Sequence, residues 1–212
     1  MEPSFWHKKW AIKEIGFHQT EANPLLVKYF KALSLAQGSR IFLPLCGKTL
    51  DIGWLLSIGY RVAGAELSEV AIDELFFELG MKPEVTTVGK LKQYSGANID
   101  IFVGDFFDLS ASTLGSVDAI YDRAALIALP EAMRQQYSSH LIHLTNKAPQ
   151  LLICLEYDQA LLAGPPFSID TTEVNRHYSK LYNLSRISST DVAGGLKGKC
   201  AAKENVWLLL ND

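Results

Sequence analysis

Short apolar runs alternate with amphipathic stretches along most of the chain. The stretches "TLDIGWLLSIG" (49–59) and "SEVAIDELFFELG" (68–80) have apolar residues at helical spacing, and the second lies between a suitable N-cap, Ser68, and a stop at Gly80. A third helix is predicted for "PEAMRQQYSSHLIHLTN" (130–146). The apolar runs between them predict seven strands, over residues 40–45, 60–67, 99–105, 116–122, 150–158, 181–188 and 204–210.

The order of these elements predicts the fold class. Strands that alternate with helices lie parallel, and right-handed crossovers cover both faces of their sheet. We therefore predict an α/β domain with a doubly wound, seven-stranded, mostly parallel sheet. The last two strands have little helix between them and should form an antiparallel hairpin at an edge. Residues 81–98 are typical of two short strands, which we place outside the main sheet.

No repeat or linker divides the chain, so residues 1–212 are predicted to form one domain. Residues 1–36 precede the first strand and are predicted to form a helical cap over the active site. Four aromatic side chains in residues 1–21 favour this placement, because a free tail does not usually expose so much apolar surface.

Composition and charge bear on the partners and the cellular location of the protein. Hydrophobic residues make up 48% of the chain and the net charge is −3, which gives no electrostatic basis for binding nucleic acid or an anionic membrane. No apolar run approaches the ~20 residues that span a bilayer, and the N-terminus lacks the apolar core of a signal peptide. The cysteines, Cys46, Cys154 and Cys200, are odd in number and far apart, which fits a reducing compartment. We expect a cytoplasmic monomer with a small-molecule substrate.

In a doubly wound sheet, ligands bind beyond the carboxyl ends of the strands. The stretch "LPLCGKTLD" (43–51) follows the first strand, and its "GKT" resembles the end of a phosphate-binding loop. That loop requires another glycine five positions before Gly47, and this position is Phe42 inside the strand. A phosphate-loop NTPase is therefore disfavoured, and Gly47 is expected in a tight strand-to-helix turn.

A dinucleotide-binding fingerprint is incomplete as well, because it has three glycines and this turn has one. Glu66 nevertheless lies about 20 residues further on, where an acidic side chain binds ribose hydroxyls. One glycine, Gly47, with one acid, Glu66, indicates a cofactor that has a ribose but no pyrophosphate, such as S-adenosylmethionine, and that passes close to the backbone at Gly47. Asp105 ends a neighbouring strand and supports the same pocket. The structural alternative is that both acids are solvated carboxylates near helix N-termini.

Several distinctive stretches carry a family resemblance: "FWHKKW", "IGFHQTEANPLL", "LPLCGKTLDIGWL", "GAELSEVAI", "GDFFDL", "YDRAALIALP" and "LEYDQALLAGPPFS". Together they run from about Phe5 to Ser168 and resemble the bacterial thiopurine S-methyltransferases. The resemblance implies the class I methyltransferase fold and S-adenosylmethionine as methyl donor, with S-adenosylhomocysteine as product. It implies methylation of aromatic or heterocyclic thiols, and of related selenium or tellurium compounds. It places cofactor contacts on Trp10, Leu45, Glu66 and Arg123, with Asp105 and Phe106 near the adenine, and a substrate contact on Phe17.

The chemistry of such a reaction agrees with these residue types. A thiol on an electron-poor ring is substantially ionised near neutral pH, so transfer needs positioning rather than a strong base. No catalytic residue is therefore expected beyond positioning by Arg123 and Phe17. Arg123 is expected to hold the cofactor carboxylate or the acceptor, and its structural alternative is a pair with Asp122. Trp10 is expected over the cofactor, and its alternative is an anchor for the N-terminal segment.

Other candidate chemistry is weaker. A phosphatase loop would place an arginine six positions after Cys46, where the chain has Ile52. His140 and His143 share a helical face, but no carboxylate or cysteine is spaced to complete a metal site, so we expect a solvated face and no metal. Two other functions stay open at this point, a nicotinamide-dependent oxidoreductase and a cofactor-binding protein without turnover.

Overall fold

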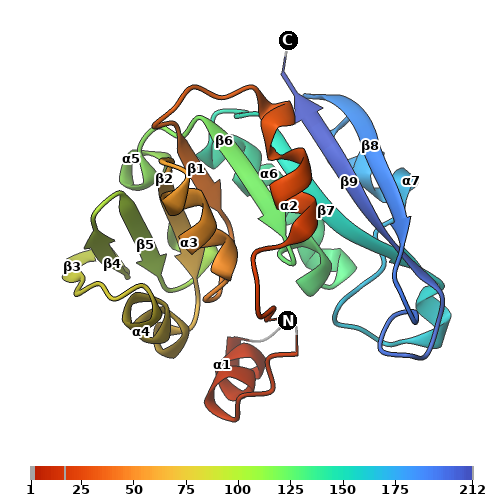
Figure 1. The fold of residues 1–212 in the computed structure, drawn as a ribbon, viewed down its shortest axis with the longest axis horizontal. Helices are drawn as coiled ribbons and strands as arrows, with labels where there is room; N and C mark the ends of the chain where they lie inside the picture. Colours follow the sequence, from red (N-terminus) through yellow and green to blue (C-terminus); the bar gives the residue numbers. More distant parts are fainter. Residues whose placement is uncertain (1–2, 17, 212) are drawn as a thin grey trace.

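The structure is a computed structural model that describes residues 3–16 and 18–211. Its centre is a nine-stranded sheet with the order β3-β4-β5-β2-β1-β6-β7-β9-β8, and helices lie on both faces (Figure 1). The five central strands are parallel. They are β1 (Arg40–Leu43), β2 (Arg61–Glu66), β5 (Ile99–Val103), β6 (Ala119–Arg123) and β7 (Gln150–Tyr157).

All seven predicted strands are present, and the predicted C-terminal hairpin is confirmed. The strand β9 (Ala202–Leu210) runs antiparallel to β7, and β8 (Asn183–Asp191) pairs with β9 as the outermost strand. The polar, exposed residues of β8 suit this edge position because only one of its sides is paired.

The placement of residues 81–98 outside the sheet was wrong. They form β3 (Glu84–Val88) and β4 (Leu91–Gly96), and β4 pairs antiparallel with β5, which extends the sheet to nine strands. Only Leu91 and Tyr94 of this hairpin are buried, while β3 is largely exposed. An edge hairpin with so few buried side chains lacks the apolar runs by which the other strands were predicted.

Alternate residues of each strand enter two cores, one on each face of the sheet. In β1, Ile41 and Leu43 join one core and Phe42 joins the other. The first core lies under α2 (Pro24–Tyr29), η1 (Phe30–Leu33), α3 (Leu50–Ser57) and α4 (Glu69–Glu78). The second lies under α5 (Ala111–Leu114), α6 (Glu131–Leu144) and α7 (Thr171–Tyr178), with the short helices η2 (Phe106–Asp108) and η3 (Leu126–Ala128). Among the described helices, none has the length and apolar character needed to cross a bilayer.

The N-terminal residues fall in two places. The helices α2 and η1 pack Leu26, Phe30 and Leu33 into the core, whereas α1 (Pro3–Ala11) lies across the end of the sheet where the parallel strands finish (Figure 1). Asn23 caps α2, and its backbone N–H donates to the buried Asp51 carboxylate at 2.6 Å. The chain is therefore fixed to the core at Asn23, whereas α1 is the helix of residues 1–36 that lies over the end of the sheet.

Candidate functional site

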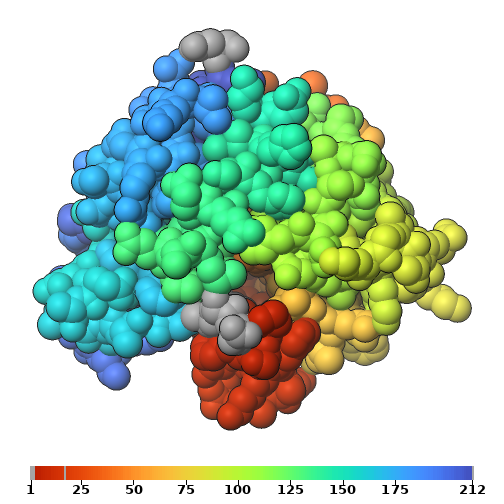
Figure 2. Space-filling view, turned by 180° about the vertical axis from the view of Figure 1, so that it is seen from behind, coloured from red at the N-terminus to blue at the C-terminus, as the bar shows by residue number. Residues whose placement is uncertain are grey.

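The carboxyl ends of β1, β2 and β6 meet at the point where the chain reverses its direction across the sheet, which is the switch point of the fold. β1 has β2 on one side and β6 on the other. This end of the molecule is hollowed between α1 and the segments that follow β5 and β6 (Figure 2). The predicted residues lie at or just past the carboxyl ends of β1, β2, β5 and β6, so the topology brings them to the carboxyl-terminal edge of the sheet; they are Leu45, Gly47, Glu66, Asp105 and Arg123.

Glu66 is the buried acid of this edge, with only 6% of its surface exposed. One carboxylate oxygen accepts the N–H of Gly47 at 2.8 Å, and the other accepts the N–H of Ser68 at 2.8 Å. Burial raises the pKa of Glu66, while these backbone donors favour the ionised form. The carboxylate is thus held in one orientation between the glycine turn and the start of α4.

The turn that follows β1 has an unusual backbone. Leu45 has φ +47° and Gly47 has φ +54°, and Ala124, just past β6, has φ +65°. A bulky residue such as leucine rarely adopts the left-handed region, and such positions concentrate at ligand sites. A non-glycine residue in the left-handed region therefore follows β1 (Leu45) and another follows β6 (Ala124), one on each side of the switch point.

Trp10 of α1 covers this turn. A Cβ atom added to Gly47 would stand 3.0 Å from Cζ2 of the Trp10 ring, and Trp10 is buried. Gly47 thus provides the space into which the indole packs. The Trp10 ring of α1 thus makes a close approach to this glycine, and contact of Gly47 with the cofactor stays a prediction.

Ion pairs fix the same region from the side. Lys48 lies 2.9 Å from a Glu74 carboxylate oxygen and 2.6 Å from Glu78, both on α4. Lys13 reaches the other oxygen of Glu74 at 3.3 Å. Glu74 therefore joins the end of α1 to the glycine turn. Because Lys48 is paired with two carboxylates, its ammonium group is not free to bind a phosphate. This agrees with the incomplete phosphate-binding loop in the sequence.

The two residues predicted near an adenine lie differently. The Asp105 carboxylate is exposed and caps η2 by accepting the N–H of Phe107 at 3.0 Å. The ring of Phe106 is buried in the core, 5.2 Å from the Tyr137 ring and 5.0 Å from that of His140. Of this pair, Asp105 is the side chain at the surface of the edge. The expectation of a solvated His140 was wrong, because it is half-buried beside Phe106, although His143 is exposed.

Arg123 is half-buried at the end of β6, and among the described residues no carboxylate forms an ion pair with it. The alternative of a pair with Asp122 is not seen. Asp122 is fully buried and instead accepts the Tyr137 hydroxyl at 2.7 Å and the Leu126 N–H at 3.3 Å. Burial raises the pKa of Asp122 to about 6. The Arg123 guanidinium is thus left for other partners.

His18, to which the sequence analysis assigned no role, is half-buried near the same edge. Burial, and after it the charge of Lys48, lower the pKa of His18, and Arg123 acts in the same direction. The segment after α1 therefore passes within electrostatic range of both sides of the switch point. Phe17, predicted to face the substrate, lies outside the described residues. The one sequence signal for His18 was its place beside Phe17 in "IGFHQTEANPLL".

Cys46 sits at the same turn but is not a nucleophile. It is buried, and burial together with the charge of Glu66 raises the pKa of its thiol well above the usual value. The thiol therefore stays protonated, whereas nucleophilic cysteines need a lowered pKa.

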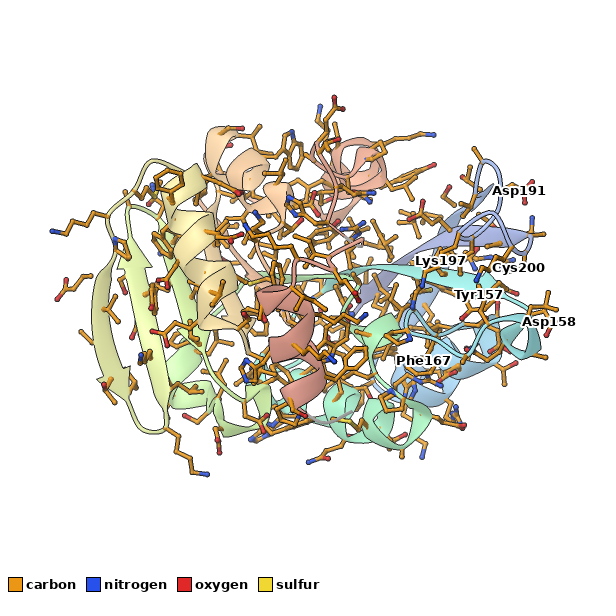
Figure 3. The ribbon with its side chains drawn as sticks, turned by 90° about the horizontal axis from the view of Figure 1, so that it is seen from below. Tyr157, Asp158, Phe167, Asp191, Lys197 and Cys200 are labelled. Carbon is orange, nitrogen blue, oxygen red and sulfur yellow. The ribbon has the colours of Figure 1, made fainter. Side chains whose placement is uncertain are left out.

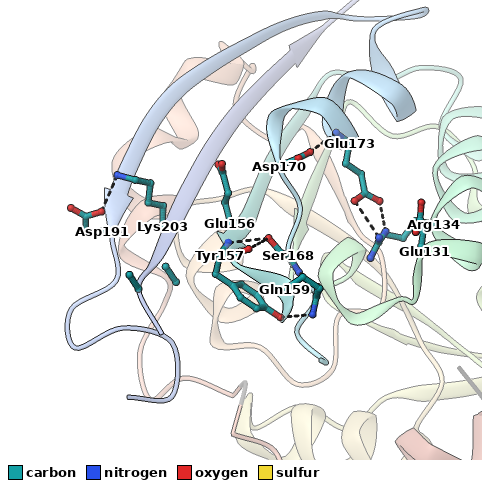
Figure 4. Close-up of a pocket in the computed structure, with 12 residues that line it drawn as sticks. Glu131, Arg134, Glu156, Tyr157, Gln159, Ser168, Asp170, Glu173, Asp191 and Lys203 are labelled. Atoms are coloured by element: carbon teal, nitrogen blue, oxygen red, sulfur yellow. Dashed lines mark hydrogen bonds and ion pairs between the residues drawn. The ribbon is translucent and has the colours of Figure 1, made fainter. Parts of the chain in front are cut away.

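The loop after β7, which contains η4 (Gln159–Leu161) and the "GPPF" stretch (164–167), lies against the segment that follows β6. The backbone N–H of Phe167 donates to the Ile127 carbonyl at 2.7 Å, only four residues beyond Arg123. The β8–β9 connection lies against the same loop, and Lys197 donates to the Pro165 carbonyl at 3.2 Å (Figure 3). Tyr157 and Ser168 at the base of the loop border a cavity of about 590 Å³ (Figure 4).

Comparison with known proteins identifies the family. The sequence profile of the thiopurine S-methyltransferase (TPMT) family matches residues 1–211. The chain belongs to the thiopurine S-methyltransferase family. It is 57% identical over 210 residues to the thiopurine S-methyltransferase of Xanthobacter autotrophicus, and the match covers 99% of both chains. It is 54% identical to that of Teredinibacter turnerae, over 99% of this chain and 97% of the other.

Solved structures agree with the family at the level of the fold. An Anabaena variabilis S-adenosylmethionine-dependent methyltransferase superposes with a TM-score of 0.66 at 15% identity, over 99% of this chain and 94% of the other. A Burkholderia thailandensis 1,6-didemethyltoxoflavin N1-methyltransferase gives 0.67 at 13% identity, over 99% and 87%. The predicted class I methyltransferase fold and dependence on S-adenosylmethionine are confirmed. The oxidoreductase alternative is not supported. For a thiopurine S-methyltransferase family member, the hollow edge at Glu66 is the natural candidate for the cofactor site.

Proposed function

We propose that the protein transfers a methyl group from S-adenosylmethionine to the sulfur atom of an aromatic heterocyclic thiol of the thiopurine class. The observation that carries the proposal is the buried Glu66 carboxylate at the switch point, which Gly47 and Ser68 orient from opposite sides. The name shared by the relatives supports the acceptor class. Related selenium and tellurium compounds are soft acceptors of the same kind and belong to the proposal.

The residues at the edge fit an adenosine-based cofactor. A carboxylate fixed by backbone donors still has lone pairs for two ribose hydroxyls, and Asp105 offers exposed acceptors beside it. The strained turn at Leu45 and Gly47 brings backbone close to the same place. Arg123 has no acidic partner among the described residues and would hold either the cofactor carboxylate or the acceptor.

The N-terminal helix α1 is proposed to act as the cap. Trp10 packs over the glycine turn, and the Lys13–Glu74 pair fastens the end of the helix. Closure by α1 would exclude water and present the segment with Phe17 and His18 to the acceptor. The helices α2 and η1 belong to the fixed core and would not move with it.

Catalysis by these residues consists of positioning. When bound, the cofactor supplies a methyl group on a positively charged sulfur. The acceptor thiol ionises readily, so the chain needs no general base. Arg123, the cap and the "GPPF" loop align the acceptor sulfur with the methyl group and exclude water. Such alignment lowers the barrier by up to ~7–11 kcal/mol.

Two measurements test the proposal. Calorimetry should show S-adenosylhomocysteine binding with at least about tenfold preference over NAD and ATP. A methyl-transfer assay should then show S-methylation of 6-mercaptopurine, with selenite and tellurite as comparison acceptors. Binding without transfer to any of these acceptors would contradict the proposed reaction, and preferential binding of NAD would contradict the cofactor site.

The cellular location and the oligomeric state are proposed from the composition of the chain and the state of its cysteines. All three cysteines are free and buried, which fits a reducing compartment, and we propose a cytoplasmic location. The net charge of −3 supports a protein that does not bind nucleic acid, and we propose that it acts as a monomer. Sedimentation of the purified protein with and without S-adenosylhomocysteine would test the oligomeric state.

A further inference from the structure

Arg134, on the first turn of α6, is a buried cation outside the cofactor edge. Only 5% of its surface is exposed. One guanidinium nitrogen donates to the Leu129 carbonyl at 3.0 Å, and another donates to the Glu173 carboxylate of α7 at 3.2 Å. The remaining nitrogen of the guanidinium also pairs with Glu173 (Figure 4). Its Cζ atom lies over the Phe167 ring, 5.7 Å from the ring centre.

These contacts join three segments that are far apart in the sequence. Leu129 belongs to the turn that follows Arg123 and η3, Phe167 belongs to the loop after β7, and Glu173 belongs to α7. A guanidinium can serve all three at once because its edges donate in fixed directions while its face stays free for an aromatic ring. A lysine ammonium has the same charge but neither the fork nor the face.

Phe167 is the residue that Arg134 places. Its ring is half-buried and packs against the Cα of Gly164 on its own loop, where an added Cβ would lie 2.6 Å from the ring. Its backbone N–H donates to Ile127, and the base of the loop is held by Ser168, which bonds the N–H and the carbonyl of Tyr157. The backbone of the loop is thus fixed at both ends, and the ring is oriented by the guanidinium.

We infer that Arg134 is a positioning residue for the acceptor, which sets the Phe167 ring as the apolar wall opposite the cap. The inference rests on the proposed function, because it takes the acceptor to lie past the ends of β6 and β7. Arg134 itself does not contact the cofactor edge, since its partners are Leu129, Phe167 and Glu173. Its loss should therefore affect the acceptor and leave the cofactor unaffected.

The test is Arg134→Lys in the full-length protein. A misplaced Phe167 ring removes apolar contact that the acceptor makes in the ground state and the transition state alike, so we expect the KM for 6-mercaptopurine to rise by about fivefold to tenfold or more. The Kd for S-adenosylhomocysteine should stay within about twofold. A residue that only stabilised the fold would lower kcat through the active fraction and leave this KM unchanged.

Arg176→Gln is the matched control. Arg176 also pairs with Glu173, at 3.3 Å, but it is exposed and among the described contacts touches neither Leu129 nor Phe167. It should leave both constants unchanged. Phe167→Leu removes the ring from the other side and should raise the same KM, and the double variant should show less than the sum of the two free-energy changes because the residues act as one unit.

Hydrogen–deuterium exchange of residues 158–169 gives a measurement that does not depend on activity. Exchange in this loop should be faster in Arg134→Lys and unchanged in Arg176→Gln. A wild-type protein inactive on all thiols would count against the proposed function. If the wild type is active, an unchanged acceptor KM in folded Arg134→Lys would overturn the positioning role. If that variant does not fold, an unchanged KM in Phe167→Leu would do the same. Unchanged exchange of the loop would also overturn it.

Discussion

Glu66→Gln should separate the structural from the ligand-binding role of this carboxylate. Both of its oxygens accept a backbone N–H at 2.8 Å, from Gly47 and from Ser68. Glutamine has one acceptor oxygen, so one of these N–H groups would face an NH₂ donor. A buried, unsatisfied N–H costs about 1–3 kcal/mol. The variant also avoids the burial of a charge, which raises the Glu66 pKa, so we expect a loss near ~1 kcal/mol.

For a domain of this size, ~1 kcal/mol lowers Tm by about 2–4 °C. The effect on the cofactor should be larger. Each charge-assisted hydrogen bond to a ribose hydroxyl is worth about 1.5–3 kcal/mol, so the Kd for S-adenosylhomocysteine should rise by about tenfold to a hundredfold. Calorimetry measures the Kd and thermal unfolding measures the Tm of the same variant.

Ser68→Ala supplies the control of equal stability. It removes the N-cap of α4, whose hydroxyl accepts the Ala71 N–H at 3.3 Å, and should also cost ~1 kcal/mol. It leaves the Glu66 carboxylate in place and should bind S-adenosylhomocysteine normally. Binding by Glu66→Gln within about twofold of the wild type would refute the ribose role, and an equal loss in Ser68→Ala would show that stability alone is measured.

Three further predictions concern the cap and the core. Gly47→Ala adds a Cβ 3.0 Å from the Trp10 ring, at φ +54°, and should displace α1, which would be seen as faster tryptic cleavage in residues 8–13. Deletion of residues 1–13 should leave a cooperative melt, because the core begins with α2, but should weaken S-adenosylhomocysteine binding, because the Trp10 indole no longer covers the glycine turn. Full methyl-transfer activity after the deletion would contradict the cap. The Asp122 pKa of about 6 lies above its ordinary value, so the stability from this group is present below about pH 4 and is lost as the pH rises through about 6. The loss is up to ~3 kcal/mol, and urea unfolding of Asp122→Asn should not show it. A pH profile identical to that of the wild type would show that Asp122 is not the group responsible.

Much of the fold could be predicted because buried parallel strands need continuous apolar runs, and "RIFLPL" and "QLLICLEYD" are such runs. The hairpin β3–β4 was misplaced for the opposite reason. Its residues meet the core only at Leu91 and Tyr94, and its pairing with β5 depends on backbone hydrogen bonds that leave no mark on the side-chain pattern.

The site was predictable to the extent that topology dictates it. Glu66 and Gly47 could be paired from sequence because strand ends meet at one edge. The hydrogen bond from the Tyr137 hydroxyl to the Asp122 carboxylate could not be predicted. The two residues come from different elements, and a tyrosine on a helix face usually belongs to the core. The Glu74 bridge between Lys13 and Lys48 was hidden likewise, since charged residues on a helix usually indicate only a solvated face.

The ion pairs of Lys48 have a consequence for discrimination among abundant metabolites. An adenine nucleotide that entered this edge would bring phosphates to a turn whose lysine is already neutralised by Glu74 and Glu78, and beside the buried carboxylate of Glu66. Among the described residues this turn offers the phosphates no free cation, so such a ligand meets repulsion there instead of a counter-charge. The same arrangement suits a nucleoside that carries a positive charge. Charge at this turn therefore disfavours ATP and NAD relative to S-adenosylmethionine, although all three contain adenosine.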